Sequence, residues 1–499
     1  MKKEISILLA TALLLPVISC SKQDPSESKP AAASTPNDSQ DVPAMPEDEV
    51  SQSTGPETER LQPSIPDQTY SGQAFRFLSR PVNNPVVRYY SEIAVDEMNG
   101  EAMNDATYER TQRLEEKWEI DIISDTEESV GSTYTNSYTA GEQNWDVVVP
   151  GFVDVINLMQ GGYTANIHDI PYIDLSKPWW DGAVAESMEI GRQLYAVIGS
   201  TNTWTDSHTY GVTFNKDLAK DYQVDPYNMV RESKWTLDNM YSIAQSVTTD
   251  LDGNGEWDHH DRYGISGTTY GFNLHMISSG IFLYSKDEDG FPQLNITEEF
   301  YNAAEKICSI MTSGNYLKAT DLTGKVDDIW DKGLRDNFRW GGSLFLVNGI
   351  EEIIIFRDLD TDIGLLPLPK YTETQDRFYH PFSTYWASVM IIPRNSETTE
   401  FTGAMLEAMN ADAYYSTSQT YYDVILAGKA MRDPDSVEML NIIRSSRIMD
   451  MELVYNFLGM SGIYEKVLAN KSSDILASSI ESAKKVAQKG IERLIKKYQ

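Results

Sequence analysis

The chain has 499 residues, a formal net charge of −34 and 41% hydrophobic residues. So large an acidic excess argues against nucleic acid as a partner and against docking on an anionic lipid surface, because both surfaces attract lysine and arginine. Cys20 and Cys308 are the only cysteines in the sequence, so metal sites made of several thiolates are excluded. The length and apolar content suffice for two lobes with cores of their own.

The N-terminus has the pattern of an export signal. Lys2 and Lys3 precede an apolar run over residues 5–18, which is short for a membrane span and typical of a signal peptide. The run ends in VISC, which resembles the bacterial lipobox, where the cysteine thiol receives a diacylglyceryl group. We expect residues 1–19 to be a signal peptide and Cys20 to be lipidated, which would anchor the protein on the extracytoplasmic face of the cell membrane. A plain signal peptide is the alternative.

Residues 20–66 are rich in Ser, Pro, Glu, Asp and Gln, with almost no aromatic or branched apolar residue. Such a segment cannot bury enough apolar surface to offset its ordering entropy, so we expect a disordered tether after Cys20. No later segment has the roughly eighteen consecutive apolar residues that a membrane span needs.

The globular part is expected to start near Tyr70. Apolar periodicity predicts strands at 75–78, 120–123 and 146–149. It predicts helices at 104–119, 236–247, 297–311, 399–411 and 473–497. Strands and helices that alternate with short connections indicate an α/β fold. Cys308 falls in an apolar helical stretch and is expected to be a buried, inert thiol.

Several stretches occur in an order that resembles one known family. They are WDVVVPGFVDVINLMQGGYTANI, PWWDGAVAESMEIGRQLYAVIG followed by YGVTFNKDL, KWTLDNMYSIAQ, IGLLPLPK and YYDVILAGKAMRDPDSVEMLNII. Together they resemble the family 1 extracellular solute-binding proteins of ABC importers, which include maltodextrin-binding proteins. The resemblance covers roughly Tyr70 to Tyr498. It implies a two-lobe, periplasmic-binding-protein-like (type II) α/β fold that closes on a ligand in the cleft between the lobes.

The resemblance also implies a domain layout and partners. Lobe 1 is expected at 67–210 and 360–410, lobe 2 at 211–359, and C-terminal helices at 411–499. The function implied is that of a lipid-anchored solute-binding subunit, which binds a carbohydrate, preferably an oligosaccharide, and delivers it to ABC permease subunits in the membrane. HExxH, GxSxG, GxxxxGK[ST] and GxGxxG motifs are absent from the sequence, so no enzyme is expected. A surface-anchored hydrolase and a receptor for a membrane sensor are the alternatives.

Residues 250–261 match the calcium loop of an EF-hand. Oxygen side chains stand at positions 1, 3, 5, 9 and 12, a glycine stands at position 6, and position 7 would contribute its backbone carbonyl. In order these metal-ligand candidates are Asp250, Asp252, Asn254, Glu256, Asp258 and Asp261. A strand follows the loop instead of a second helix, so we expect a single structural calcium site. An acidic turn without an ion is the alternative.

Aromatic and polar residues near the predicted cleft are candidate ligand contacts. Sugars present apolar C–H faces and many hydroxyl groups, so their sites combine aromatic rings with hydrogen-bonding side chains. Trp204, Asp206 and His208 precede FNKDL, where the family's chain crosses the cleft. Further candidates are Phe152, Asp154, Tyr270, Phe272, Trp340, Tyr385 and Trp386. With 10 Trp and 28 Tyr in the chain, core packing is an equally good interpretation for any one of these aromatic rings.

Overall fold

The computed structural model describes residues 60–82, 90–427 and 433–498. The predicted signal peptide, Cys20 and most of the predicted tether lie outside the described residues. The compact unit begins at Leu61, whose backbone N–H donates to the Tyr415 hydroxyl at 3.0 Å, and Ile65 packs against the core. The globular part therefore starts before residue 66, where the sequence places the end of the tether, because two isolated apolar residues give too weak a signal.

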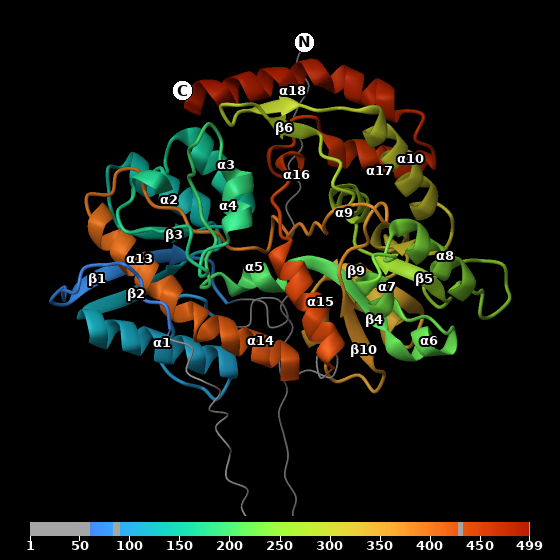
Figure 1. Cartoon of the computed structure of the whole chain (residues 1–499), viewed down its shortest axis with the longest axis horizontal. Coiled ribbons are helices and arrows are strands. Elements are labelled where there is room, and N and C mark those ends of the chain that lie inside the picture. Colours follow the sequence, from blue (N-terminus) through green and yellow to red (C-terminus); the bar gives the residue numbers. More distant parts are fainter. Residues whose placement is uncertain (1–59, 83–89, 428–432, 499) are drawn as a thin grey trace, which may run out of the picture. The chain divides into compact units, whose positions relative to one another are not determined.

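Lobe 1 is built on a three-stranded parallel sheet with β1 between β2 and β3 (Figure 1). Its strands are β1 (Gln73–Ser79), β2 (Ile120–Thr126) and β3 (Val147–Val149). Its helices are α1 (Ala102–Trp118), α2 (Val130–Thr139), α3 (Phe152–Gly161), α4 (Gly182–Met188) and α13 (Thr399–Tyr414). Phe75, Phe77 and Leu78 of β1 are fully buried, as expected for a central strand covered on both faces.

Lobe 2 contains a mixed five-stranded sheet in the order β10-β4-β9-β5-β8. Its strands are β4 (Tyr210–Asn215), β5 (Tyr263–Gly267), β8 (Tyr316–Lys318), β9 (Ser343–Gly349) and β10 (Ile363–Leu366), and β6 (Tyr284–Lys286) and β7 (Pro292–Leu294) form a separate hairpin. Its longer helices are α6 (Lys216–Asp221), α7 (Pro226–Arg231), α8 (Leu237–Val247), α9 (Gly271–Ser278) and α10 (Glu298–Met311). A π-helical turn (Ile329–Arg335), α11 (Asp336–Arg339) and α12 (Glu352–Ile355) flank β9.

Two crossings connect the lobes near the middle of the molecule. The first runs from α5 (Thr203–Ser207) into β4. The second follows β10, which pairs with β4 and so belongs to the sheet of lobe 2. Sequence analysis assigned residues 360–410 to lobe 1, but the return starts only after Leu366 and reaches lobe 1 where Ile391 bridges Val148. One short apolar run does not reveal which sheet it joins, so this boundary could not be read from the sequence.

The C-terminal helices contact both lobes (Figure 1). They are α14 (Thr417–Ala427), α15 (Pro434–Ser445), α16 (Met451–Tyr455), α17 (Met460–Asn470) and α18 (Leu476–Tyr498). Helix α14 packs on α1 and α5, α15 on β10, and α17 on α9 and α10. The C-terminal region is therefore part of the same core and not an appended domain.

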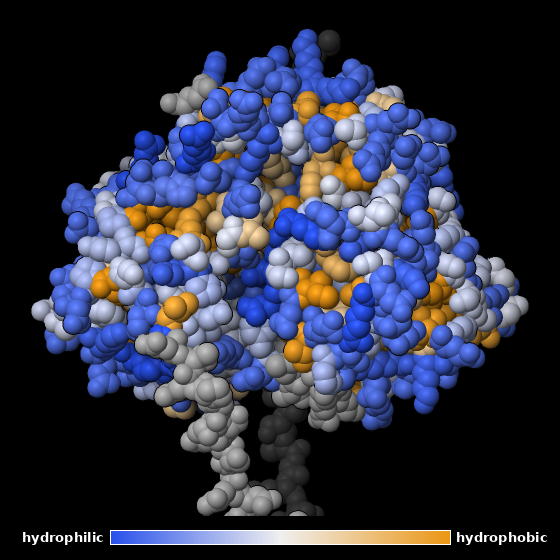
Figure 2. Space-filling view, viewed as in Figure 1, coloured by the Kyte–Doolittle hydropathy of each residue, from blue (hydrophilic) through white to orange (hydrophobic). Residues whose placement is uncertain are grey.

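The surface is largely hydrophilic. On the face in Figure 2, polar and charged side chains predominate and hydrophobic residues form separate patches. Among the helices of the described ranges, none is long and apolar enough to cross a bilayer. The predominance of charged side chains at the surface agrees with the net charge of −34, because charged residues are mostly exposed in folded proteins.

A buried ion-pair cluster ties the first crossing to the C-terminal region. The Arg447 guanidinium pairs with Asp206 of α5 and with Asp181, which caps α4, the latter at 2.7 Å. All three side chains are almost fully buried. The neighbouring His380 of the second crossing forms a β-bridge with Arg447. Arg447 therefore joins lobe 1 and the first crossing through its side chain, and the second crossing through its backbone.

We predict that Arg447→Met destabilises the protein by about 3–5 kcal/mol, because two buried carboxylates then lack a counter-charge. Denaturant unfolding followed by tryptophan fluorescence measures the loss. Arg357→Met, at a site where the side chain is 61% exposed, is the matched control and should change stability little. Adding Asp181→Asn and Asp206→Asn to Arg447→Met should recover much of the loss. Equal stability of Arg447→Met and the wild type would contradict this role.

Candidate ligand-binding site

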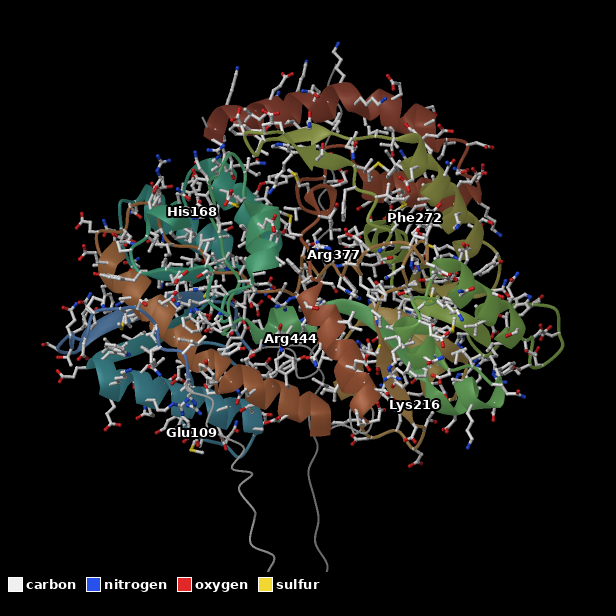
Figure 3. The ribbon with its side chains drawn as sticks, in the orientation of Figure 1. Glu109, His168, Lys216, Phe272, Arg377 and Arg444 are labelled. Carbon is white, nitrogen blue, oxygen red and sulfur yellow. The ribbon has the colours of Figure 1, made fainter. Side chains whose placement is uncertain are left out.

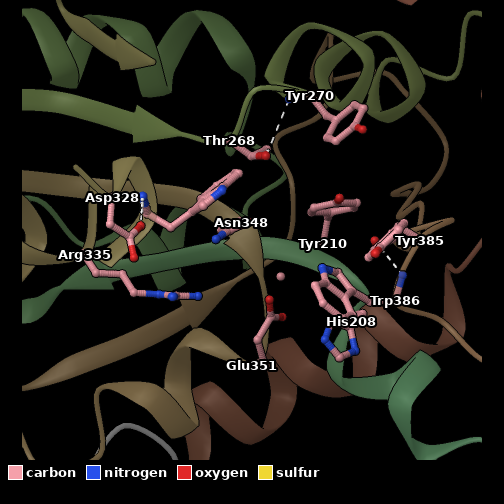
Figure 4. Close-up of a pocket in the computed structure, with 13 residues that line it drawn as sticks. His208, Tyr210, Thr268, Tyr270, Asp328, Arg335, Asn348, Glu351, Tyr385 and Trp386 are labelled. Carbon is pink, nitrogen blue, oxygen red and sulfur yellow. Dashed lines mark hydrogen bonds between the residues drawn. The ribbon is translucent and has the colours of Figure 1, made fainter. Parts of the chain in front are cut away.

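A cavity of about 330 Å³ lies where the two crossings meet the ends of β5 and β9 (Figure 4). Its lining residues are His208, Tyr210, Thr268, Tyr270, Asp328, Trp330, Arg335, Asn348, Gly349, Glu351, Ser383, Tyr385 and Trp386. Those between 210 and 351 come from lobe 2, and those from 383 onward from the second crossing. The volume is at the lower end of the range for small-molecule sites, and the walls come from lobe 2 and the two crossings.

Aromatic rings form one wall of the cavity. Tyr270, at the start of α9, is 48% exposed and Tyr385 is 64% exposed. The Trp386 ring is stacked on the His208 imidazole, with ring centroids 6.0 Å apart and an interplanar angle of 27°. The Arg80 guanidinium of lobe 1 donates to the backbone carbonyls of Tyr385 and Trp386, both at 2.7 Å. The segment that carries these two rings is thus held in place by lobe 1.

Polar groups from lobe 2 form the opposite wall. Arg335 and the fully buried Glu352 make a bidentate ion pair, with Nε 3.0 Å from both carboxylate oxygens and Nη2 2.8 Å from Oε1. The Asn348 amide also donates to Glu352, at 2.7 Å. Asp328 accepts the backbone N–H of Trp330 and caps the π-helical turn. This wall presents planar amide and guanidinium groups whose geometry is fixed by neighbours.

Two groups in the cavity have raised pKa values. Burial, together with the adjacent Glu352 carboxylate, raises the pKa of Glu351 to about 8. Burial raises the pKa of Tyr210, which keeps its hydroxyl protonated and able to donate a hydrogen bond. At neutral pH the cavity therefore offers donors and acceptors without a large fixed charge.

Four of the predicted ligand contacts line the cavity together: His208, Tyr270, Tyr385 and Trp386. Their contact with a ligand stays a prediction. These residues were predicted from their position in the sequence, because they lie at the crossings and after a strand. Sequence analysis did not select Tyr210, Asp328, Trp330, Arg335, Asn348 or Glu351. Asn348, near the end of β9, could have been found by the same rule, whereas the π-helical turn has no recognisable sequence pattern.

The other predicted contacts lie elsewhere. Trp204 is buried, and its backbone N–H donates to Glu92. Phe272, labelled in Figure 3, is stacked on Tyr464 of α17, with ring centroids 4.2 Å apart.

Phe152 packs edge-on against Phe382, so it too belongs to the core. Asp206 pairs with Arg447, and Asp154 packs beside Gly131 of α2. Trp340 is 41% exposed but does not line the cavity. Aromatic residues one or two positions apart point in different directions, and proximity in sequence does not tell which of them faces the cleft.

The acidic loop at 250–261 brings three carboxylates together. Asp250, Asp252 and Asp261 each offer an oxygen within 4.8 Å of the others. Asp250 accepts the N–H groups of Gly253 at 2.7 Å and Gly255 at 2.9 Å, and these hydrogen bonds lower its pKa. Both glycines have positive φ, +67° and +78°, which a side chain would disfavour. An all-oxygen donor set on so tight a turn fits the requirements of a calcium ion.

Asn254, Glu256 and Asp258 do not belong to the converging carboxylates. The side-chain oxygens of Asn254 and Asp258 accept backbone N–H groups within the loop, from Glu256 and His260. Hydrogen bonds of this kind, from a backbone N–H to an Asn or Asp side chain two residues earlier, are typical of tight turns. The metal-ligand roles of all six residues stay predictions.

Comparison with known proteins gives the fold. No family model matches the sequence, and no curated protein sequence matches it significantly. Among solved structures, an ABC substrate-binding protein from Listeria monocytogenes in complex with cycloalternan is similar, with 15% identity and a TM-score of 0.52 over 83% of this chain and 98% of that one.

A cyclo/maltodextrin-binding protein complexed with maltotetraose has 12% identity and a TM-score of 0.56, over 84% of this chain and 97% of that one. A maltose/maltodextrin-binding domain from Bdellovibrio bacteriovorus, bound to maltotriose, has 13% identity and a TM-score of 0.51, over 85% and 100%. The chain thus has the two-lobe, periplasmic-binding-protein-like α/β fold of these sugar-binding proteins, and the cavity described above lies where lobe 2 meets the two crossings.

Proposed function

We propose that the chain is the solute-binding subunit of an ABC importer and that it binds an oligosaccharide in the cavity where lobe 2 meets the two crossings. The observation that carries the proposal is the cavity wall in which exposed aromatic rings face a polar wall from lobe 2. Solved proteins of the same fold whose names and complexes are those of sugar binders support it.

The two walls match the two kinds of surface on a sugar. Tyr270 and Tyr385 expose ring faces on which the C–H face of a pyranose can stack. Arg335 and Asn348 can hydrogen-bond hydroxyl groups at the edge of the same ring. Because the rings of 385 and 386 are held by lobe 1 through Arg80, a ligand that touches both walls stabilises the closed arrangement of the lobes. Closure of this kind signals the loaded state to a permease.

Membrane attachment belongs to the same proposal. Lipidation at Cys20 and a tether over the following residues would hold the binding unit at the extracytoplasmic face of the cell membrane, next to the permease subunits. The tether raises the local concentration of the unit near its partner without restricting lobe motion. The lipobox-like VISC sequence and the low-complexity segment after it support this part.

Ligand binding can be tested by replacing two aromatic residues of similar exposure, of which one lines the cavity and the other does not. Tyr270 lines the cavity and is 48% exposed, whereas Trp340 lies outside it and is 41% exposed. We expect at least one neutral oligosaccharide from a panel of maltotriose, maltotetraose, cyclodextrins and raffinose to raise the melting temperature. We expect Tyr270→Ala to weaken its affinity roughly tenfold or more, which corresponds to the loss of one stacking contact.

Isothermal titration calorimetry measures both variants, and Trp340→Ala should bind like the wild type. Absence of binding by every sugar of the panel would contradict a carbohydrate ligand of this class. Equal losses in the two variants would place the binding site elsewhere.

We further propose that the loop 250–261 binds a structural calcium ion. Asp250, Asp252 and Asp261 would supply carboxylate oxygens, and the carbonyl of Glu256 would complete the pattern. The ion would neutralise three converging carboxylates and fix the loop between α8 and β5, the strand that ends near the cavity. Its role would be to stabilise lobe 2 and not to contact the ligand.

Calcium removal tests this directly. We expect EGTA to lower the melting temperature of the wild type, because an ion that binds only the folded state stabilises it by mass action. Asp250→Ala should abolish the sensitivity to EGTA. Glu256→Ala, in the same loop, should retain it, since only the backbone carbonyl of that residue is in the pattern. Identical melting curves with and without EGTA would show that the loop holds no ion.

A further inference from the structure

A second cavity, of about 570 Å³, lies beside the C-terminal half of α18, where this helix passes the ends of α3 and α16 (Figure 1). Six of its lining residues belong to α18, three lie at the end of α16, and Gln160 of α3 completes the lining. The volume is within the range of small-molecule sites. None of these residues lines the cavity described above, so the two cavities are separate.

Three cations of α18 line this second cavity in a single row. Lys489, Arg493 and Lys497 follow one another at intervals of four residues, which places them on one face of the helix, about 6 Å apart along its axis. An ion pair of α18 joins Lys484 to Glu481, outside the cavity. Within the residues that the structure describes, no carboxylate pairs with any of the three cations. The row therefore presents its positive charge to the cavity.

No acidic side chain offsets this charge. The described lining contains no aspartate or glutamate, although the chain has 75 acidic residues and a net charge of −34. The α18 segment carries six Lys or Arg residues and two Glu residues, and neither glutamate lines the cavity. A positive concave surface on so acidic a protein is a local feature, and it attracts anions in preference to neutral or cationic solutes.

Two aromatic rings lie next to the cations. Tyr455 and Phe457 are stacked, with ring centroids 5.2 Å apart and an interplanar angle of 11°. Phe457 lies against Gly490, where an added Cβ atom would be 2.7 Å from the ring carbon Cδ1, so only a glycine lets the ring approach the helix this closely. Tyr284 of β6 packs edge-on against the same ring, with centroids 6.2 Å apart. The cavity thus combines a row of cations with an apolar surface that is fixed by its neighbours.

We propose that this cavity is a second ligand site and that it binds a small organic anion with two or more acidic groups. Phosphate, sulfate or carboxylate groups about 6 Å apart pair with neighbouring cations of the row, and Arg493 can hold one of them through two parallel hydrogen bonds. The body that carries these groups packs on the Phe457 ring. The site is independent of the sugar-binding function proposed above, because the ligand differs in charge and the linings share no residue.

Cations near a helix C-terminus also have a structural role, because they interact favourably with the negative end of the helix dipole within the last turn. This effect explains why cations stand at the end of α18, but it does not explain why they face the cavity. Lys489 lies well before the last turn, where the dipole effect has faded. Lys496 separates the two roles, because it lies in the last turn, is exposed and does not line the cavity.

The experiment compares the wild type with Arg493→Gln, Lys496→Gln and Phe457→Leu by isothermal titration calorimetry at low and at physiological ionic strength. The probes are fructose bisphosphate, trigalacturonate and inorganic phosphate. We expect the wild type to bind at least one of the two organic polyanions, roughly tenfold or more tightly than inorganic phosphate, and less tightly as salt is added. Arg493→Gln should weaken this binding about 5- to 10-fold, as expected for the loss of one exposed charge pair, whereas Lys496→Gln should bind like the wild type.

Phe457→Leu keeps an apolar side chain and removes the ring. It should weaken binding of the organic polyanion about 3- to 10-fold and leave that of inorganic phosphate unchanged. Thermal unfolding without ligand should show the same small loss for Arg493→Gln and Lys496→Gln, which excludes misfolding as the cause of a difference in binding. The neutral sugars of the panel above should bind Arg493→Gln as they bind the wild type, so this site and the proposed function can fail separately.

Three results would overturn the site. Equal losses in Arg493→Gln and Lys496→Gln would reduce the effect to a general attraction by the helix. Absence of binding by both organic polyanions, or binding of inorganic phosphate as tight as theirs, would leave an adventitious ion only. Flotation with phosphatidylglycerol vesicles tests the remaining source of acidic groups: association with the vesicles without binding of the soluble polyanions would make this face a membrane contact.

Discussion

The short crossing at residues 203–210 is the constraint on which the rest of the structure depends. Within this segment Asp206 is held by Arg447, and His208 and Tyr210 open into the cavity. In the same segment, the carbonyl of Ser207 accepts a hydrogen bond from the N–H of Glu351. Anchoring and cavity-lining residues therefore alternate within one turn of helix and the start of one strand. A shift of this segment would move both walls of the cavity at once.

The crossings are fixed both to the C-terminal region and to the walls of the cavity. The Arg447 cluster and the β-bridge from His380 fix the crossings to the C-terminal region. The aromatic rings at 385 and 386 are held by Arg80 of lobe 1, and the polar groups belong to the sheet of lobe 2. Tyr270 of lobe 2 also belongs to the aromatic wall, so the cavity is built on lobe 2 and the two crossings. Preorganised walls of this kind lower the ordering cost of binding.

The sequence predicted the fold better than the site, and the reason is physical. Helices such as 236–247 and strands such as 75–78 carry a periodic apolar pattern, and β1, β2, β3, α8 and α10 fall on the predicted segments. Sheet membership is set by partners far away in the sequence, which is why β10 was assigned to the wrong lobe. The family resemblance selected His208 and Trp386, which line the cavity, and their contact with a ligand stays a prediction. It could not tell them from Trp204 and Phe272, which differ only in the direction of the side chain.

The buried acidic side chains of this strongly acidic chain are held by donors within the protein. Glu407 accepts both indole N–H groups of Trp179 and Trp180, and Glu452 accepts the Tyr284 hydroxyl and two backbone N–H groups. Glu352 and Asp206 are paired with arginine. Each of these buried carboxylates is satisfied within the protein, as the cost of an unpaired buried charge requires.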